Sequence, residues 1–151
     1  MAKTRVRQAV KADFPTLLNI DKLSFPPGIA YDSSELAYFM KRAGAHTLVA
    51  ELDGEIAGFI LMEIMPRRKA AILVTLDVRK ELQRQGFASH LLSSSEEVLR
   101  NNEIERYELQ VDVHNGGAIE FYEKNGFVKM RQLSNYYSNG HDAHLMLKLL
   151  A

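Results

Sequence analysis

The chain contains no cysteine. Disulfide bonds, a thiol nucleophile and zinc sites with cysteine ligands are therefore all excluded, and a reducing compartment suits this composition. Charge of one sign does not prevail either, because 19 Lys and Arg residues balance 19 Asp and Glu residues. A neutral chain lacks the basic surface typical of proteins that bind nucleic acids or anionic lipids, so we expect neither partner.

Long apolar runs are also missing. No stretch of the sequence reaches the roughly 20 apolar residues that a membrane helix needs, and residues 1–11 are basic and mixed, unlike a signal peptide. We therefore expect a cytoplasmic protein without a membrane segment, either a monomer or a homodimer. The 151 residues, 46% of them hydrophobic, predict one domain over 1–151 that buries a core of its own.

Local signals predict a first strand at residues 4–10 and then two helices. Asp13 is expected to cap the first helix, which the Phe-Pro-Pro-Gly run at 25–28 ends. The Asp-Ser-Ser-Glu segment at 32–35 is a variant of the capping box and starts the second helix. Gly44 is expected to end this helix as the residue that follows its C-cap.

The rest of the chain alternates strands and helices. Strands are predicted at 46–52, 55–65, 70–78, 107–113, 127–133 and 142–150, with an amphipathic helix at 87–100 and a short helix that Asn115 caps. The order β-α-α-β-β-β-α-β-α-β-β predicts an α/β (α+β) domain. Its sheet is expected to be mixed, mostly antiparallel and twisted, with flanking helices.

The most informative segment is the loop between the strand at 70–78 and the helix that follows. A helix start leaves backbone N–H groups unpaired and carries partial positive charge, so a loop that wraps into it suits a pyrophosphate. Gly86 would let the backbone approach the phosphates, and Ala88 would keep the helix entry open. Taken alone, the segment fits a tight turn without a ligand equally well. A dinucleotide-binding fold fits poorly, because the chain lacks G-x-G-x-x-G and βαβ alternation.

Two motifs carry a resemblance to a known family. Gln83-x-x-Gly86-x-Ala88 resembles the Q/R-x-x-G-x-G/A acetyl-CoA signature of the GNAT superfamily. Residues 115–127, NGGAIEFYEKNGF, resemble its second signature, N-x-x-A-x-x-F-Y-x-x-x-G-F. Both motifs occur in the expected order, one helix and one strand apart, and the resemblance covers nearly the whole chain. It implies a GNAT-like fold and an N-acetyltransferase that uses acetyl-CoA.

Three further segments narrow the resemblance to one branch of the superfamily. Asn-Tyr-Tyr at 135–137, residues 142–146, and Ser-Phe-Pro at 24–26 with Tyr31 are similar to protein N-alpha-acetyltransferases of the RimI-like branch and their eukaryotic relatives. This similarity implies that the acceptor is the N-terminal amine of a protein such as a ribosomal protein. Two alternatives stay open: a small amine such as a polyamine or amino acid as acceptor, and a catalytically weak acyl-CoA-binding regulatory module.

The resemblance also assigns residues to the cofactor. Backbone atoms of residues 76–78 would hold the acetyl and pantetheine part, and residues 84–89 would hold the pyrophosphate. Asn115 would touch the cofactor as well as capping its helix. The cofactor residues expected in this way are Leu76, Asp77, Val78, Arg84, Gln85, Gly86, Phe87, Ala88, Ser89 and Asn115.

Catalysis requires a proton donor for the departing thiolate and a proton acceptor for the amine. Tyr122 stands where the family places its acid, although the position also suits a core tyrosine. Gln110 matches the position of the base, which is commonly glutamate or histidine in the similar enzymes. Glutamine cannot accept this proton, but it can hydrogen-bond the amine or a water. Substitute bases acting through water, each of which also fits an exposed polar residue, are Asp77, Asp112 and His114.

Aromatic residues are expected to line the acceptor groove, although loop tyrosines also pack simply at a rim. The substrate residues implied by the resemblance are Phe25, Tyr31, Tyr136 and Tyr137. No metal site is expected from His141 and His144, because no cysteine accompanies them and a strand beginning at Asp142 would not direct both to one point. The basic run at 67–69 is read as a solvated turn.

Overall fold

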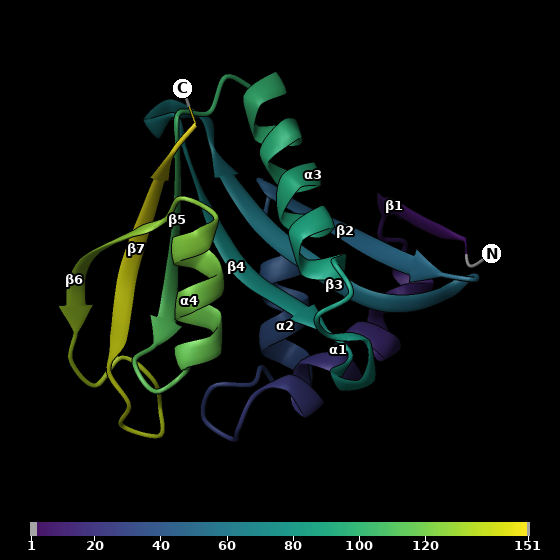
Figure 1. Ribbon diagram of the computed structural model, residues 1–151, viewed down its shortest axis with the longest axis horizontal. Helices are drawn as coiled ribbons and strands as arrows, with labels where there is room; N and C mark the ends of the chain where they lie inside the picture. The colour runs from purple at the N-terminus through teal and green to yellow at the C-terminus, as the bar shows by residue number, and fades with distance from the viewer. Residues whose placement is uncertain (1–2, 151) are drawn as a thin grey trace.

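The computed structural model describes residues 3–150, which form a seven-stranded sheet with helices on both faces (Figure 1). The strands are β1 (Thr4–Gln8), β2 (Ala45–Leu52), β3 (Glu55–Met65), β4 (Ala70–Val78), β5 (Arg106–Asp112), β6 (Val128–Leu133) and β7 (Ala143–Leu149). The helices are α1 (Phe14–Ser24), α2 (Ser33–Met40), α3 (Phe87–Asn101) and α4 (Gly116–Lys124). The predicted order of elements and the fold class are confirmed. None of the described helices has the length and apolar character needed to cross a membrane.

The strand order is β1-β2-β3-β4-β5-β7-β6, and the only parallel pair in the described sheet is β4 with β5. This parallel pairing is short, because it runs only from Ala70 opposite Arg106 to Leu73 opposite Leu109. Beyond Leu73, β4 continues to Val78 beside β3, while β5 continues beside β7. The two central strands therefore separate toward the ends where the loop 79–86 follows β4 and α4 follows β5 (Figure 1).

Side chains at the helix ends explain where α2 begins and correct one expectation. The Asp32 carboxylate accepts a hydrogen bond from the Glu35 N–H at 2.8 Å, and the Asp32 N–H donates to the Glu35 carboxylate at 3.1 Å. This reciprocal pair is the predicted capping box. Gly44 does not end α2, which stops at Met40. Instead, a Cβ atom at Gly44 would lie 2.1 Å from the Ile64 carbonyl oxygen, so glycine permits close contact with β3.

Asp13 differs in part from its prediction as well. It occupies the N-cap position of α1, but its side chain makes no capping bond to that helix. Its carboxylate accepts from the Val10 N–H at 2.7 Å and pairs with the Arg7 guanidinium at 2.8 Å. Asp13 therefore stabilises the turn before α1 and ties it to β1.

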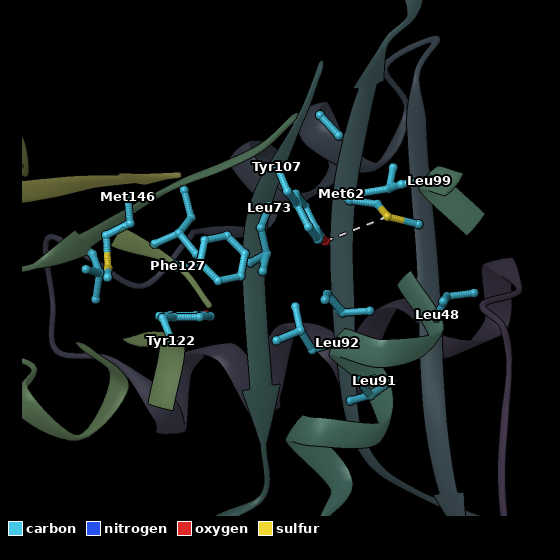
Figure 2. Packing of buried hydrophobic residues seen from close by; sticks show 14 of the residues in the cluster. Leu48, Met62, Leu73, Leu91, Leu92, Leu99, Tyr107, Tyr122, Phe127 and Met146 are labelled. Atoms are coloured by element: carbon cyan, nitrogen blue, oxygen red, sulfur yellow. Dashed lines mark hydrogen bonds between the residues drawn. The ribbon is translucent and has the colours of Figure 1, made fainter. Parts of the chain in front are cut away.

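Two apolar clusters pack on opposite faces of the sheet. One contains Leu91, Leu92 and Leu99 of α3 together with Tyr107, Tyr122 and Phe127 (Figure 2). The other contains Leu17 and Ile20 of α1 and Leu36 of α2, packed on Val49, Phe59 and Leu61. Full burial of each such side chain contributes roughly 1.5–3 kcal/mol. The helices thereby fix the sheet from both sides and hold the separated ends of β4 and β5 in place.

Candidate active site

A cleft of about 1080 Å³ opens where β4 and β5 separate. It brings together nearly all the site residues expected from the sequence. Those that line it are Phe25, Tyr31, Leu76, Asp77, Val78, Arg84, Gly86, Phe87, Ala88, Ser89, Gln110, Asn115, Tyr122, Tyr136 and Tyr137. Gln85 does not line the cleft, and its side-chain amide lies 3.5 Å from the Glu81 carbonyl oxygen that it faces as a donor.

The loop before α3 leaves the start of that helix open. Arg84 and Gly86 adopt left-handed backbone conformations, with φ of 63° and 90°, and α3 begins at Phe87 without a side-chain cap. A Cβ atom at Gly86 would meet nothing within 4 Å, so the space beside it is free. Uncapped N–H groups with adjacent free space are what a phosphate group needs. Gln83, the first residue of the motif, donates its side-chain amide to the Val78 carbonyl at 3.3 Å and joins the loop to β4.

One edge of β4 carries backbone groups that β5 does not pair. Asp77 and Val78 pair with Phe59 and Gly58 of β3, whereas the pairing of β4 with β5 has already ended at Leu73. A Cβ atom at Gly58 would lie 2.4 Å from the Asp77 carbonyl oxygen, so glycine is required for this close approach. The free edge of β4 can therefore hydrogen-bond an extended ligand lying in the cleft.

Tyr122 belongs both to the core and to the cleft. Its ring packs edge-on against Phe127 with centroids 5.5 Å apart, and the residue is 8% exposed. Burial raises the pKa of its hydroxyl well above the ordinary value, and the neighbouring Asp77 carboxyl raises it further. The hydroxyl thus stays protonated at neutral pH and can act as a proton donor.

Asp77 is a buried side chain, unlike the exposed polar residue that the sequence also allowed. Asp77 is 2% exposed and Asp21 is 0% exposed. The Thr75 hydroxyl oxygen lies 2.6 Å from one oxygen of Asp77 and 3.3 Å from one of Asp21. Burial raises the pKa of Asp77, and its contact with Asp21 raises it further. The other oxygen of Asp21 accepts from the Tyr31 N–H at 2.7 Å and so fixes the loop after α1.

Asp112 is also buried, and it joins two histidines. Its two carboxylate oxygens lie 3.1 Å from Nδ1 of His114 and 2.9 Å from Nδ1 of His141. Burial raises the pKa of this carboxyl, but hydrogen bonds from the His114 backbone N–H and from both imidazoles outweigh it, so the net shift is downward. Asp112 is therefore a carboxylate.

The donor atoms of these three residues lie within 4.8 Å of one another, the one grouping among the described residues that invites a comparison with a metal site. Each Nδ1 already faces an oxygen of Asp112, so hydrogen bonds account for the grouping without an ion. His141 is thus paired with His114 and Asp112, not with His144. The expectation that the chain holds no metal stays a prediction.

Two loops meet at one end of the cleft. Ser138, after β6, donates its hydroxyl to the Gly28 carbonyl of the loop after α1 at 3.1 Å. The rings of Tyr136 and Tyr137 pack edge-on with centroids 4.9 Å apart. Burial raises the pKa of the hydroxyls of Tyr31 and Tyr137, so both stay protonated. Together these loops form a wall of neutral hydroxyl groups and aromatic rings.

Residues 12–127 match the family model described as the acetyltransferase (GNAT) family. The chain belongs to the GNAT family. This GNAT chain is an acetyltransferase, and acetyl-CoA is its acetyl donor.

Relatives agree with this assignment. A Sulfurisphaera tokodaii protein named N-alpha-acetyltransferase is 32% identical, and the match covers 94% of the GNAT chain and 90% of the relative. A Saccharolobus solfataricus protein of the same name is 32% identical, with coverages of 96% and 92%. The crystal structure of Ard1 from Thermoplasma volcanium superposes with a TM-score of 0.90 at 24% identity, covers 98% of both chains and supports the fold.

The cleft of this GNAT acetyltransferase is lined by the protonated phenol of Tyr122 and by the amide of Gln110, which is not basic. Two features of the site escaped the sequence analysis. Asp21 gave no signal because it lies within the amphipathic pattern of α1, far in sequence from Asp77. The bond between Asp112 and His141 spans 29 residues and depends on the course of the loop before β7.

Proposed function

We propose that this acetyltransferase transfers the acetyl group of acetyl-CoA to the N-terminal α-amine of a protein, such as a ribosomal protein. The observation that carries the proposal is the shape of the cleft. It runs from the uncapped start of α3 to the aromatic wall that holds Tyr136 and Tyr137. One end suits the diphosphate of the donor and the other an extended peptide. The relatives named N-alpha-acetyltransferase support the same acceptor.

The donor would lie along the free edge of β4. We place its pyrophosphate on residues 84–89 and its pantetheine amides on the backbone of residues 76–78, with Asn115 on the facing side. The N–H of Val78 would bond the thioester oxygen and stabilise the oxyanion that develops there. Tyr122 would then donate its proton to the departing thiolate of CoA. Gln110 would hydrogen-bond the attacking amine or a water.

The acceptor would enter between the two loops that meet at Ser138 and Gly28. The hydroxyl groups of Tyr31 and Tyr137 would bond the peptide backbone, while Phe25 and Tyr136 would pack on the first side chain. The amine then lies beside the separated ends of β4 and β5, where the acetyl group is presented.

A panel of peptides with acetyl-CoA tests this assignment. The products are measured by mass spectrometry, and each peptide carries one internal lysine so that transfer to the α-amine is distinguished from transfer to a side chain. A matched peptide with a blocked N-terminus is the control and should not react. Spermidine and free amino acids are offered in parallel.

Two other outcomes define the alternatives. Transfer only to spermidine or amino acids would make the chain a small-molecule acetyltransferase. Acetyl-CoA binding without transfer to any amine would make it a regulatory module, a role that Gln110 motivates. Cytoplasmic location, a monomeric or homodimeric state and a single domain over 1–151 stay predictions from the sequence.

A further inference from the structure

The acceptor amine must lose a proton before it attacks, and the groups nearest to the cleft floor do not accept one. Gln110 carries an amide, which is not basic at neutral pH. Asp77 has one oxygen without a partner, but that oxygen is buried and the residue is 2% exposed, so an amine in the cleft does not reach it. Both oxygens of Asp112 are occupied by His114 and His141. A different group is therefore needed.

We propose that His141, oriented by the carboxylate of Asp112, is the general base of this acetyltransferase; the inference rests on the proposed function above. Nδ1 of His141 lies 2.9 Å from the Asp112 carboxylate. An ionised carboxylate only accepts hydrogen bonds, so Nδ1 carries the proton and Nε2 keeps a free lone pair. That lone pair is the proton acceptor.

The position of His141 suits this role. Asp112 follows Gln110 by two residues on the same face of β5, about 7 Å along the strand. Both His141 and Gln110 line the cleft, and the imidazole of His141 together with one water would bridge a separation of this size. The His141 backbone N–H donates to the Asn139 side chain at 3.0 Å, and its carbonyl accepts from the Tyr137 N–H at 3.1 Å. The ring is thus held beside the aromatic wall before any acceptor arrives.

His114 makes a similar bond to Asp112 but is held less firmly. Its side chain is 67% exposed, compared with 38% for His141, and it lies outside the loop that carries the tyrosines. The His114 backbone N–H donates to Asp112 at 3.0 Å and stays in place when the ring is removed. His114 also lines the cleft, so the control for His141 is His46 of β2, which lies outside the cleft lining.

The proton transfer balances with the groups present. An N–H bond of the acceptor ammonium breaks, an N–H bond forms at Nε2 of His141 directly or through one water, and the electron pair stays on the amine nitrogen. Two carboxylates face the imidazolium of His141, those of Asp112 and Asp142. The other titratable groups around it are the imidazole of His114 and the neutral hydroxyl of Tyr137. After transfer, Nε2 releases its proton to solvent.

The test compares His141→Gln with His46→Gln on an N-terminal peptide. For His141→Gln we expect kcat/KM to fall about 100-fold or more, the usual size of general base catalysis, while the Kd for acetyl-CoA is unchanged. His46→Gln should stay within about twofold of the wild type. The pH profile of kcat/KM should change in His141→Gln and stay that of the wild type in His46→Gln.

Two further variants test separately whether a base is missing and whether Asp112 orients it. Adding Gln110→Glu to His141→Gln places a carboxylate at the position from which the base is missing, and we expect it to restore most of the rate. Asp112→Asn keeps the shape but removes the carboxylate that orients the ring, so kcat should fall with little change in the KM for acetyl-CoA.

Several outcomes would overturn the inference. His141→Gln with the rate and pH profile of the wild type would exclude His141 as the base. Loss of wild-type activity with EDTA, together with a zinc ion that His141→Gln no longer binds, would make the grouping a metal site. A wild-type protein that acetylates no amine would end the proposed function and the inference together. Activity on spermidine alone would overturn the proposed acceptor, and loss of that activity in His141→Gln would still support His141 as the base.

Discussion

The hydroxyl oxygen of Thr75 lies 2.6 Å from the carboxyl group of Asp77, close enough for a strong hydrogen bond. The same hydroxyl also lies 3.3 Å from Asp21. A hydroxyl has one proton to donate, so the shorter contact marks Asp77 as its main acceptor. Burial and the neighbouring Asp21 raise the pKa of Asp77, so this carboxyl keeps its proton to a higher pH than an exposed aspartate does.

Asp77→Asn should raise the free energy of unfolding at pH 7. The folded-state pKa of Asp77 is raised by burial and then by Asp21, so the folded chain keeps a proton that the unfolded chain loses above about pH 4. Stability from this group is complete below that pH and declines as the pH rises toward the folded-state pKa. Each unit of elevation corresponds to about 1.4 kcal/mol, which urea unfolding at pH 4 and pH 7 would measure.

Asp13→Asn serves as the opposite case. The Arg7 guanidinium hydrogen-bonds Asp13 and lowers its pKa, so its contribution to stability is present above about pH 4 and is lost as the pH falls. This substitution should destabilise the chain at pH 7. If Asp77→Asn and Asp13→Asn both changed the free energy of unfolding by equal, small amounts, the folded chain would not hold a proton on Asp77.

Gly86→Leu should abolish the binding of acetyl-CoA while the chain stays folded. The left-handed backbone at Gly86, with φ of 90°, costs a leucine about 1–2 kcal/mol, and its side chain would fill the space assigned to the pyrophosphate. Gly54→Leu is the control, because Gly54 has φ of 85° and equally open surroundings at the β2–β3 turn. Isothermal titration should show unchanged acetyl-CoA affinity in the control alone.

Tyr122→Phe should slow turnover about 100-fold while the Kd for acetyl-CoA changes little. The ring keeps its packing against Phe127, and only the proton donor is removed. Steady-state kinetics with a reactive peptide and calorimetry with acetyl-CoA separate the two effects. A variant as fast as the wild type would remove Tyr122 from the mechanism.

Tyr136→Ala should raise the KM for a peptide by about tenfold, equivalent to about 1.4 kcal/mol, with acetyl-CoA affinity preserved. The ring of Tyr136 is 47% exposed, packs edge-on against Tyr137 and lines the cleft. Tyr38→Ala is matched to it, because Tyr38 is 58% exposed and lies on α2 away from the cleft lining. If both variants bind peptide as the wild type does, Tyr136 makes no contact with the acceptor.

Patterns that act over a few residues predicted most of the fold. The alternation along β5 and the capping box at Asp32 depend on neighbours in sequence, and both are present. Gly44 was wrongly predicted to end α2, because a glycine after a helix usually marks the end of that helix. Here glycine is required by the close contact of this position with Ile64 of β3. Tertiary contact decided that position, and the local sequence does not encode it.

The site was predictable where a motif spans consecutive residues and not where distant segments meet. The loop that contains Gly86 and the helix that contains Tyr122 lie on the cleft as expected. The burial of Asp77 and Asp112 was missed, because each is covered by an element far away in the chain: α1 with Asp21 for one, and the loop with His141 for the other. Charged residues on strands look exposed until their partners are known.

The short pairing between β4 and β5 makes the sheet two ribbons joined by four residue pairs, with β1 to β4 on one side and β5, β7 and β6 on the other. A donor bound along the free edge of β4 would connect the two parts of the sheet where β4 and β5 no longer pair. We expect amide hydrogen exchange at residues 76–78 to slow when acetyl-CoA binds, and the two ribbons to melt at a higher and more uniform temperature. The two parts of the sheet are thus joined along their full length only while acetyl-CoA is bound.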